Sequence, residues 1–315
     1  MSRTVVLLGP QGPSPDVGAA VAELGVRKVA LVMAGYQERE PDDTQIAKAI
    51  GVPVVNLGLH ARAAELFASD PEFREAYHQR QNRLRNIQAF YRVRLEKTDE
   101  AGRMISVRYV DEELLAQEDK VSVEQLRTLD RDHVERCAAV RMQFELQWKP
   151  SERESVIRHR AQVAEMIADT EALVIAGGHV ASLLNRLALF DVIEASAPKP
   201  VIAWSAGAMV LTDHVVLFHD YPPYGSDIAQ VLDAGFGLAP RLVVLPDPKR
   251  RLRQDDRGGI ARFARRMAPA ACIAMDTGTR VVVQRGQVTS SRVARLAPSG
   301  AYEEQWPRAA GATPA

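Results

Sequence analysis

The stretch PVIAWSAGAM at residues 200–209 decides how this chain is expected to fold. A short apolar run ends there at Ser205, and small residues that can begin a helix follow at once. A strand that turns sharply into a helix at a serine is a nucleophile elbow, which exposes the hydroxyl beside the first free N–H groups of the helix. Ser205 is therefore a candidate nucleophile, although the same letters also suit a serine that caps a helix.

A second apolar run, ALVIAGGH at residues 172–179, ends in the glycine pair Gly177 and Gly178 and a histidine. An amphipathic pattern over residues 180–189 predicts a helix directly after it. Two such strand–turn–helix units favour neighbouring parallel strands, whose carboxyl ends lie side by side where open α/β sheets bind ligands. The N–H groups of Gly178 and Ala206 can then form an oxyanion hole beside Ser205.

Four segments of the chain resemble the dipeptidase E and cyanophycinase family of serine peptidases, within the class I glutamine amidotransferase-like superfamily. The resemblance covers residues 170–293 well and 1–57 weakly. The four segments are IAGGHVASLLNRL (175–187), AWSAGA (203–208), LDAGFGLAP (232–240) and AMDTGTRVVV (274–283). The resemblance implies an α/β fold with a doubly wound, mostly parallel sheet, and hydrolysis of a peptide, isopeptide or amide bond through Ser205. It is more specific for the fold than for the activity.

The chain departs from the family pattern at three positions, one of which is Thr277, where the family has a glutamate. Asp247 stands where the catalytic histidine is expected, and His179 stands where the family has an asparagine. An aspartate has an unperturbed pKa of about 3.9, against about 6.5 for histidine, so Asp247 is a poor general base near neutral pH. Two functions therefore stay open: a serine hydrolase, and a catalytically degenerate member that binds a small ligand or a protein partner.

The sequence contains seven histidines and does not decide which residue accepts the proton of Ser205. His219 and His179 are the leading candidates, and a chain without any protein base is the alternative. Asp220 stands at the spacing of the acidic triad residue in some family members, which implies a triad of Ser205, His219 and Asp220. Adjacent residues of a strand point to opposite faces, however, so His219 and Asp220 need not touch each other.

The substrate is expected to lie near the residues that surround the elbow. We assign substrate contacts to Gly177, His179, Asp247 and Arg251. Arg251 belongs to a basic run at residues 249–253, and its guanidinium has the forked geometry that binds a carboxylate. The alternative interpretation of this run is a surface cluster that caps a helix.

The composition of the 315 residues is that of an ordinary globular protein, with 46% hydrophobic residues, 25% charged residues and a formal net charge of zero. A neutral chain has no overall field that attracts nucleic acid or an anionic membrane. Cys137 and Cys272 lack metal-ligand spacing and fit buried thiols of a reducing compartment. We therefore expect a cytoplasmic protein with a small peptide or amide substrate, and with no metal, cofactor, nucleic acid or membrane partner.

The α/β pattern occupies residues 1–58 and 150–296, which predicts a discontinuous core interrupted by a helical insertion at 59–149. Apolar residues at three- and four-residue steps predict two long helices in the insertion, with a short strand at residues 104–110 between them. Residues 297–315 contain few core-forming residues and are expected to be disordered.

The predicted helices of the insertion carry both charged and apolar residues, and the apolar ones need a surface to pack against. We interpret the arginines of its first helix as a solvated face, because glutamates dilute them: Arg74, Arg80, Arg83, Arg85, Arg92 and Arg94. Phe73, Phe90, Tyr109 and Trp148 add apolar surface that one helical hairpin cannot hide. We therefore expect a homodimer in which the arm packs against its partner. A lid over the chain's own Ser205 site is the competing arrangement.

Overall fold

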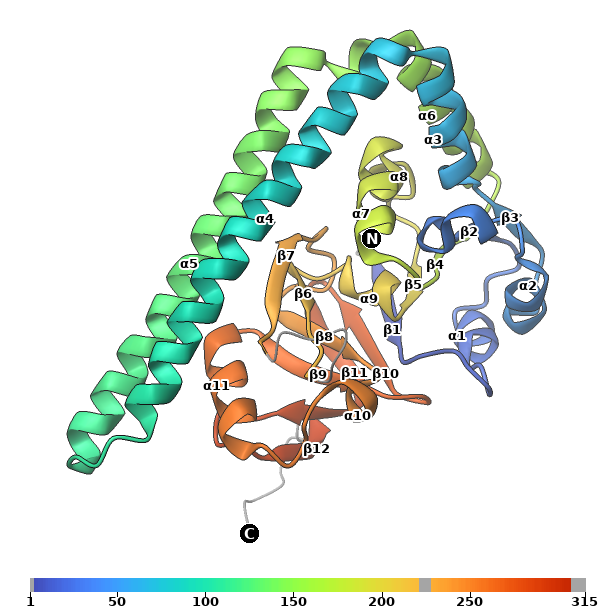
Figure 1. Cartoon of the computed structure of the whole chain (residues 1–315). Coiled ribbons are helices and arrows are strands. Elements are labelled where there is room, and N and C mark those ends of the chain that lie inside the picture. The colour runs from blue at the N-terminus through green and yellow to red at the C-terminus, as the bar shows by residue number, and fades with distance from the viewer. Residues whose placement is uncertain (1–2, 221–227, 307–315) are drawn as a thin grey trace.

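The computed structural model describes residues 3–220 and 228–306 of the chain. Its centre is one sheet of ten strands (Figure 1). The strands are β1 (Thr4–Leu8), β2 (Val29–Val32), β3 (Val54–Asn56), β4 (Ala172–Ile175), β5 (Val201–Trp204), β8 (Leu242–Pro246), β9 (Ala271–Met275), β10 (Arg280–Gln284), β11 (Gln287–Leu296) and β12 (Tyr302–Trp306). Their order in the sheet is β3-β2-β4-β5-β1-β10-β11-β9-β8, and β12 pairs with β11.

The sheet is parallel from β3 through β2, β4 and β5 to β1, and β8 also runs parallel to β9. Antiparallel pairs connect these two parts through β10 and β11. The predicted fold class, an α/β protein with a mostly parallel sheet and a large helical insertion, is confirmed. A separate two-stranded sheet of β6 (His214–Leu217) and β7 (Gln230–Ala234) follows the elbow.

Alternating strand residues divide the core between the two faces of the sheet, as the period of two in a strand requires. In β1, Val5 and Leu7 face one apolar cluster, whereas Val6 and Leu8 face another. The helices that cover these faces are α1 (Val17–Glu23), α2 (Thr44–Ile50), α3 (Leu59–Ser69), α6 (Glu154–Ala168), α7 (Val180–Leu189), α8 (Val192–Ala195), α9 (Ala206–Met209), α10 (Pro248–Arg251) and α11 (Arg257–Met267), with the 3-10 helices η1 (Ala34–Arg39) and η2 (Pro150–Glu152).

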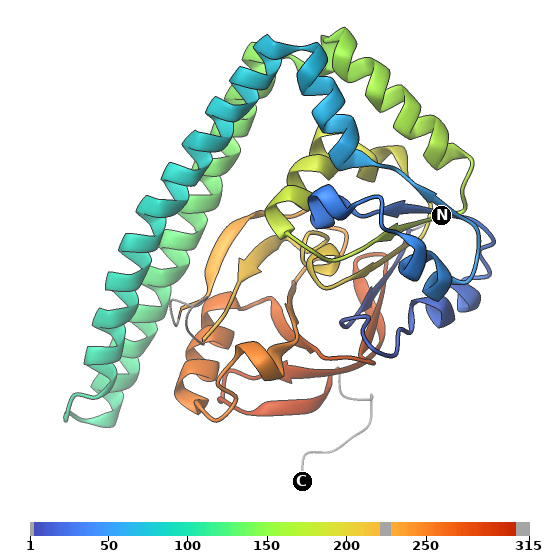
Figure 2. The same ribbon diagram turned by 45° about the vertical axis from the view of Figure 1, so that its right-hand side comes forward.

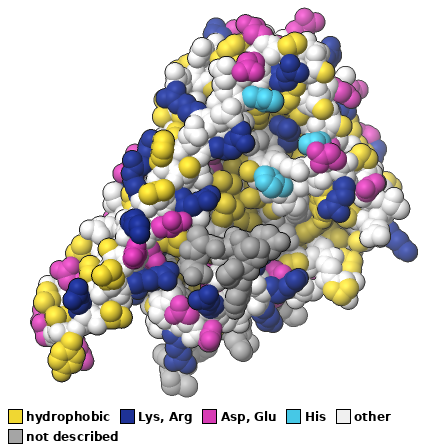
Figure 3. All heavy atoms as spheres, in the orientation of Figure 1, with side chains coloured by type: hydrophobic (Ala, Val, Ile, Leu, Met, Phe, Trp, Pro, Cys, Tyr) yellow, Lys and Arg dark blue, Asp and Glu magenta, His cyan; other side chains and the backbone are white. Residues whose placement is uncertain are grey.

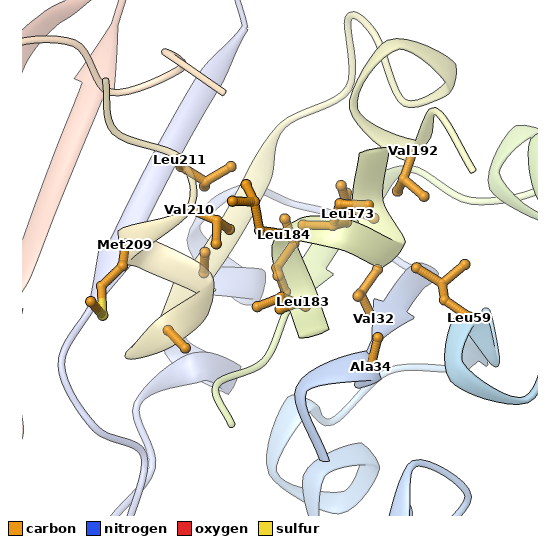
Figure 4. Close-up of a cluster of buried hydrophobic side chains, with 14 of the residues drawn as sticks. Val32, Ala34, Leu59, Leu173, Leu183, Leu184, Val192, Met209, Val210 and Leu211 are labelled. Carbon is orange, nitrogen blue, oxygen red and sulfur yellow. The ribbon is translucent and has the colours of Figure 1, made fainter. Parts of the chain in front are cut away.

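Helix α7 lies at the centre of the larger cluster. Figure 4 shows its Leu183 and Leu184 between Leu173 of β4 and the residues Val210 and Leu211 that follow α9. Burial of each such side chain stabilises the fold by about 1.5–3 kcal/mol. Because α7 and α9 both begin at the carboxyl ends of strands, this packing fixes the two turns that carry the candidate site.

The insertion forms a hairpin of two long helices, which we call the arm: α4 (Pro71–Ser106) and α5 (Glu112–Trp148). Figures 1 and 2 both show the arm lying along the core with its tip beyond it. Asp70 caps α4 by accepting the Phe73 N–H at 3.0 Å, and Asp111 caps α5 through the Leu114 N–H at 2.9 Å. The strand expected at residues 104–110 is wrong, because α4 continues through Ser106 and a turn leads directly into α5.

A buried polar network attaches the arm to the core. Arg266 of α11 is almost fully buried and donates to both carboxylate oxygens of Asp130 of α5, at 2.7 and 2.6 Å. The Tyr91 hydroxyl of α4 donates to Asp130 at 2.6 Å and accepts the Val231 N–H of β7 at 3.1 Å. One guanidinium therefore joins both helices of the arm to two elements of the core.

A second set of contacts continues along β7. Both terminal nitrogens of Arg141 donate to the carboxylate of Asp233. The His133 ring stacks on Tyr91 with a centroid distance of 4.2 Å and contacts the Leu232 carbonyl through Nε2 at 3.1 Å. These contacts lie on one side of the arm, which is therefore packed against its own core for much of its length.

Part of the segment that was predicted to be disordered forms a strand. Residues 297–315 were expected to be disordered, yet Tyr302–Trp306 form strand β12. Its backbone pairs with β11, with Tyr302 opposite Leu296 and Glu303 opposite Arg295, and Arg295 forms an ion pair with Glu303 at 2.7 Å. The exposed edge of β11 supplies these hydrogen bonds, which residue composition does not reveal. Residues 307–315 of the same prediction lie outside the described residues.

We predict that Arg266→Met lowers the free energy of unfolding by about 3–5 kcal/mol, because Asp130 stays buried without its cationic partner. The double variant Arg266→Met/Asp130→Leu should recover most of this loss, since it removes the unpaired charge as well. Urea unfolding monitored by circular dichroism measures both effects. Arg83→Met, at an exposed position of α4, is the control, and an Arg266→Met protein as stable as this control would contradict the account.

Candidate active site

Ser205 lies between the end of β5 and the start of α9, in a backbone conformation with φ 50° and ψ −123°. Non-glycine residues rarely adopt positive φ, and such strain persists only where the surrounding structure holds it. The neighbours Trp204 and Ala206 are buried, whereas Ser205 is half-buried. The chain thus presents the serine side chain at the carboxyl edge of the sheet.

Two glycines make this turn sterically possible. A Cβ on Gly207 would lie 2.3 Å from the Ile175 carbonyl oxygen, so only glycine lets α9 pack against the end of β4. A Cβ on Gly177 would lie 3.0 Å from the Ser205 Cβ. The glycine pair after β4 and the small residues after β5 therefore fit each other, and they bring the two turns into contact.

A cavity of about 680 Å³ opens at Ser205. Gly178, Ala206, His219 and Arg251 line it together with the serine. Its apolar lining comes from Val180, Met209, Leu217, Phe218 and Ile228. Figure 3 shows hydrophobic side chains in the hollow between the arm and the core, with Lys or Arg side chains along the arm beside them. The cavity can therefore accept a ligand with both apolar and charged parts.

Two backbone N–H groups are available at this cavity. Gly178 has a φ of 105°, and Ala206 is the first residue of α9. Within residues 3–220 and 228–306, no hydrogen-bond acceptor contacts the N–H of either residue. Free N–H groups beside a hydroxyl are the arrangement that stabilises an oxyanion, so the geometry is compatible with the oxyanion hole expected from the sequence.

The arm supplies charged groups to the same cavity. Arg92 and Glu96, one helical turn apart on α4, both line it. Neither of them forms an ion pair with a described residue, and Arg251 contributes a second guanidinium, which lies 5.7 Å from the centroid of the Phe218 ring. Sequence reasoning missed Arg92 and Glu96 as site residues, because their helix has no local motif and only its docking on the core brings them to Ser205.

Of the two expected triad partners, the structure brings only His219 to the cavity of Ser205. The described residues that line this cavity do not include Asp220. The Asp220 carboxylate accepts the Arg253 N–H at 2.9 Å, and its own N–H donates to the Arg251 carbonyl at 2.7 Å. Asp220 thus holds the segment that carries Arg251.

His179 has a structural task at the N-terminus of α7. Its Nδ1 accepts the Ser182 N–H at 3.1 Å, and its own backbone N–H donates to the Gly35 carbonyl at 2.7 Å. A ring nitrogen that accepts an N–H carries no proton, so the proton of the neutral ring is on Nε2. His179 is exposed and is not among the described residues that line the cavity. It is therefore a helix cap, a role that an asparagine at this position can also perform.

Asp247 follows β8 with a φ of 54°, at the start of α10. Its carboxylate lies 3.7 Å from Arg250, and its charge helps to raise the pKa of Asp276, for which burial is the main cause. Pro246 and Arg251 line the Ser205 cavity, but Asp247 is not among the described lining residues. The structure therefore does not place this carboxylate in the described lining of the Ser205 cavity.

No group of three or more His, Cys, Asp or Glu side chains in residues 3–220 and 228–306 is arranged to hold a metal ion. In the same residues, no helix has the length and apolar character needed to cross a membrane.

Comparisons with known proteins agree with the resemblance noted in the sequence. The profile of peptidase family S51 matches residues 128–290, which is more than half of the chain. A search of curated proteins gives no match. Similar solved structures include a peptidase from an acI-B1 Actinobacterium, with a TM-score of 0.47, 14% identity and coverage of 95% of this chain and 92% of that one. A candidate peptidase E protein from Listeria monocytogenes EGD-e has a TM-score of 0.44, 8% identity and coverage of 93% and 99%.

We predict that His179→Ala lowers the free energy of unfolding by about 0.5–2 kcal/mol. His179→Asn should be nearly as stable as the wild type, because asparagine also caps a helix. Urea unfolding of the two variants and of His214→Ala, at an exposed position of β6, provides the comparison. Equal stability of His179→Ala and His179→Asn would show that the cap does not act as described.

Proposed function

The chain belongs to peptidase family S51, and from this premise we propose that it is a serine hydrolase that cleaves a peptide, isopeptide or amide bond with Ser205 as its nucleophile. One observation carries the proposal. Ser205 is held at positive φ in the wall of a cavity that also contains His219 and the free N–H groups of Gly178 and Ala206. A nucleophile, a base and an oxyanion site are the parts that acyl transfer requires.

In the first half of the proposed reaction, the Ser205 oxygen attacks the carbonyl carbon while His219 accepts its proton. The carbonyl oxygen becomes negatively charged and accepts hydrogen bonds from the N–H groups of Gly178 and Ala206. The C–N bond then breaks, and the departing amine takes the proton from His219. In the second half, water attacks the ester carbon and His219 accepts a proton from the water. The bond between this carbon and the Ser205 oxygen then breaks, the serine oxygen takes the proton from His219, and the carboxylic acid product leaves.

His219 is the preferred base because it shares the cavity with Ser205, whereas Asp247 and His179 are not among the described residues that line it. We assign to Asp220 a positioning role. Its hydrogen bonds to the backbone of Arg251 and Arg253 hold the segment next to His219. This is a different task from the direct orientation of the histidine ring that the family triad implies.

The charges of the cavity favour a short peptide as substrate. Arg92 and Arg251 fit a carboxylate, Glu96 fits an amino group, and the apolar floor fits side chains between them. Arg92 and Glu96 lie outside the region that the family profile matches. We therefore assign part of the substrate selectivity to the arm.

The competing function is binding without catalysis. Asp247, in place of the family histidine, is the observation that favours it. A chain that has lost its base keeps the cavity, the arginines and the N–H groups, and it would bind short peptides without cleaving them.

We predict that a fluorophosphonate probe labels the wild-type protein and does not label Ser205→Ala. His219→Ala should reduce the labelling rate and the hydrolysis of short peptides by about 10²–10⁴-fold, which is the usual contribution of a general base. His214→Ala, which changes an exposed histidine of β6, is the matched control and should react as fast as the wild type.

Each other outcome has a distinct meaning. Equal labelling of wild type and Ser205→Ala would remove Ser205 as the reactive residue. A folded wild-type protein that is not labelled, yet binds short peptides, would support the non-catalytic function. Normal activity of His219→Ala would show that another group accepts the proton.

We further propose that the chain self-associates through the tip of the arm. The tip exposes Met104, Val107, Tyr109, Val110, Leu114 and Val121. Phe73, expected to add to this surface, is instead buried in the core cluster. Exposed apolar groups of this extent are typical of an interface. Arg108 lies in the turn between α4 and α5, and Glu112 is the first residue of α5. We propose that a two-fold contact pairs these opposite charges beside the apolar residues.

The double variant Val107→Lys/Tyr109→Lys should convert a dimer into a monomer in light scattering, because it places charges in the apolar contact. Phe90→Lys, at an exposed apolar position of α4 away from the tip, is the control and should remain dimeric. A wild-type protein that is monomeric, or a dimer unaffected by the tip substitutions, would contradict this proposal.

A further inference from the structure

A second cavity, of about 230 Å³, lies at the root of the arm and shares no described lining residue with the Ser205 cavity. Helices α4, α5, α6 and α7 and the segment after β7 all contribute to its walls. Three arginines line it: Arg80, Arg141 and Arg160. Glu145 is the only acidic side chain among its described lining residues. The cavity is therefore small, enclosed by several elements and rich in positive charge.

Of these three arginines, Arg80 has the fewest partners for its charge and its hydrogen-bond donors. Its guanidinium carbon lies 4.1 Å from the centroid of the Tyr77 ring and 4.5 Å from that of Phe144. Its Nε is buried and has no hydrogen-bond acceptor within the described residues. No carboxylate of the described chain lies within ion-pair distance of it. The aromatic rings hold the guanidinium in place by cation–π contact, and its buried Nε–H is left without an acceptor among the described residues.

The electrostatic balance around Arg80 is unfavourable. Burial lowers the pKa of Arg80, and the neighbouring charge of Arg141 lowers it further, while Tyr77 and Glu145 oppose these effects. Arg141 is already committed to Asp233, and the Nε of Arg160 donates to the Leu189 carbonyl at 2.9 Å. A buried cation without a partner is destabilising, and an anion in the cavity would remove this penalty.

We propose that this cavity is a binding site for a small organic carboxylate, with the carboxylate at Arg80 and a short apolar body against α7. The planar guanidinium matches the geometry of a carboxylate. Leu184, Ala188 and Phe236 supply apolar lining to the same cavity. The volume suits a compact ligand of a few carbon atoms rather than a nucleotide or a peptide chain.

This site joins the arm to the core, because its walls come from both. Arg80 and Phe144 belong to the arm, and Leu184 and Phe236 belong to the core. A bound carboxylate therefore stabilises the docked position of the arm. The inference does not depend on the reaction proposed for Ser205, since the two cavities are separate.

Hexanoate is a suitable probe, and hexan-1-ol is its neutral counterpart with the same apolar body. Isothermal titration of the full-length protein should show saturable binding of hexanoate and little binding of hexan-1-ol. Arg80→Met keeps the apolar stem and removes the charge, so it should weaken hexanoate binding at least tenfold. Arg83→Met, on the exposed side of α4, should bind as the wild type does.

Stability provides a second measurement that separates a binding role from a structural one. In buffer without carboxylates, Arg80→Met should unfold at the same temperature as the wild type or higher, because it removes an uncompensated buried charge. Hexanoate should raise the unfolding temperature of the wild type and leave that of Arg80→Met unchanged.

Three outcomes would overturn the proposal: no saturable binding of hexanoate, equal binding by wild type and Arg80→Met, or loss of binding in Arg92→Met instead. The last result would place the carboxylate in the Ser205 cavity.

Discussion

The buried contact between Arg266 and Asp130 is the constraint on which the candidate site depends. It joins α11 of the core to α5, and the Tyr91 hydroxyl extends it to α4 and β7. Leaving a buried charge unpaired is destabilising, so the position of the arm in which this network is complete is favoured. In that position α4 presents Arg92 and Glu96 to the cavity of Ser205. The arm is thus a wall of its own chain's site.

The elbow and the arm contribute to the site in different ways. The elbow is built from local sterics, because Gly177 and Gly207 allow the ends of β4 and β5 to approach each other closely. These turns orient the Ser205 side chain and the free N–H groups, which are the general parts of a hydrolase site. The arm adds Arg92 and Glu96 to the same cavity. In the proposed function these side chains bind the substrate and take no part in the chemistry of the reacting bond. Such a division allows selectivity to change while the reactive centre stays fixed.

The sequence was informative where structure is local. The turn at Ser205, the parallel neighbours β4 and β5 and the two long helices all follow from short-range patterns of apolar and small residues. The contacts of Asp220 with the backbone of Arg251 and Arg253 were not predictable from its spacing to Ser205. The arm's contribution to the cavity was not predictable, because Arg92 resembles the other exposed arginines of α4 until docking distinguishes it. Strand β12 was missed for a similar reason, since pairing with β11 compensates for its weak composition.

The central claim is that Ser205 is a nucleophile in a cavity walled by α4. The most direct test is a crystal structure of the protein with a short peptide boronic acid, because boron forms a covalent bond with an activated serine. The account predicts a bond from the Ser205 oxygen to boron, a boronate oxygen near the N–H groups of Gly178 and Ala206, and the peptide beside Arg92 and Glu96. A boronate bound elsewhere, or an adduct whose peptide runs away from the arm, would contradict it.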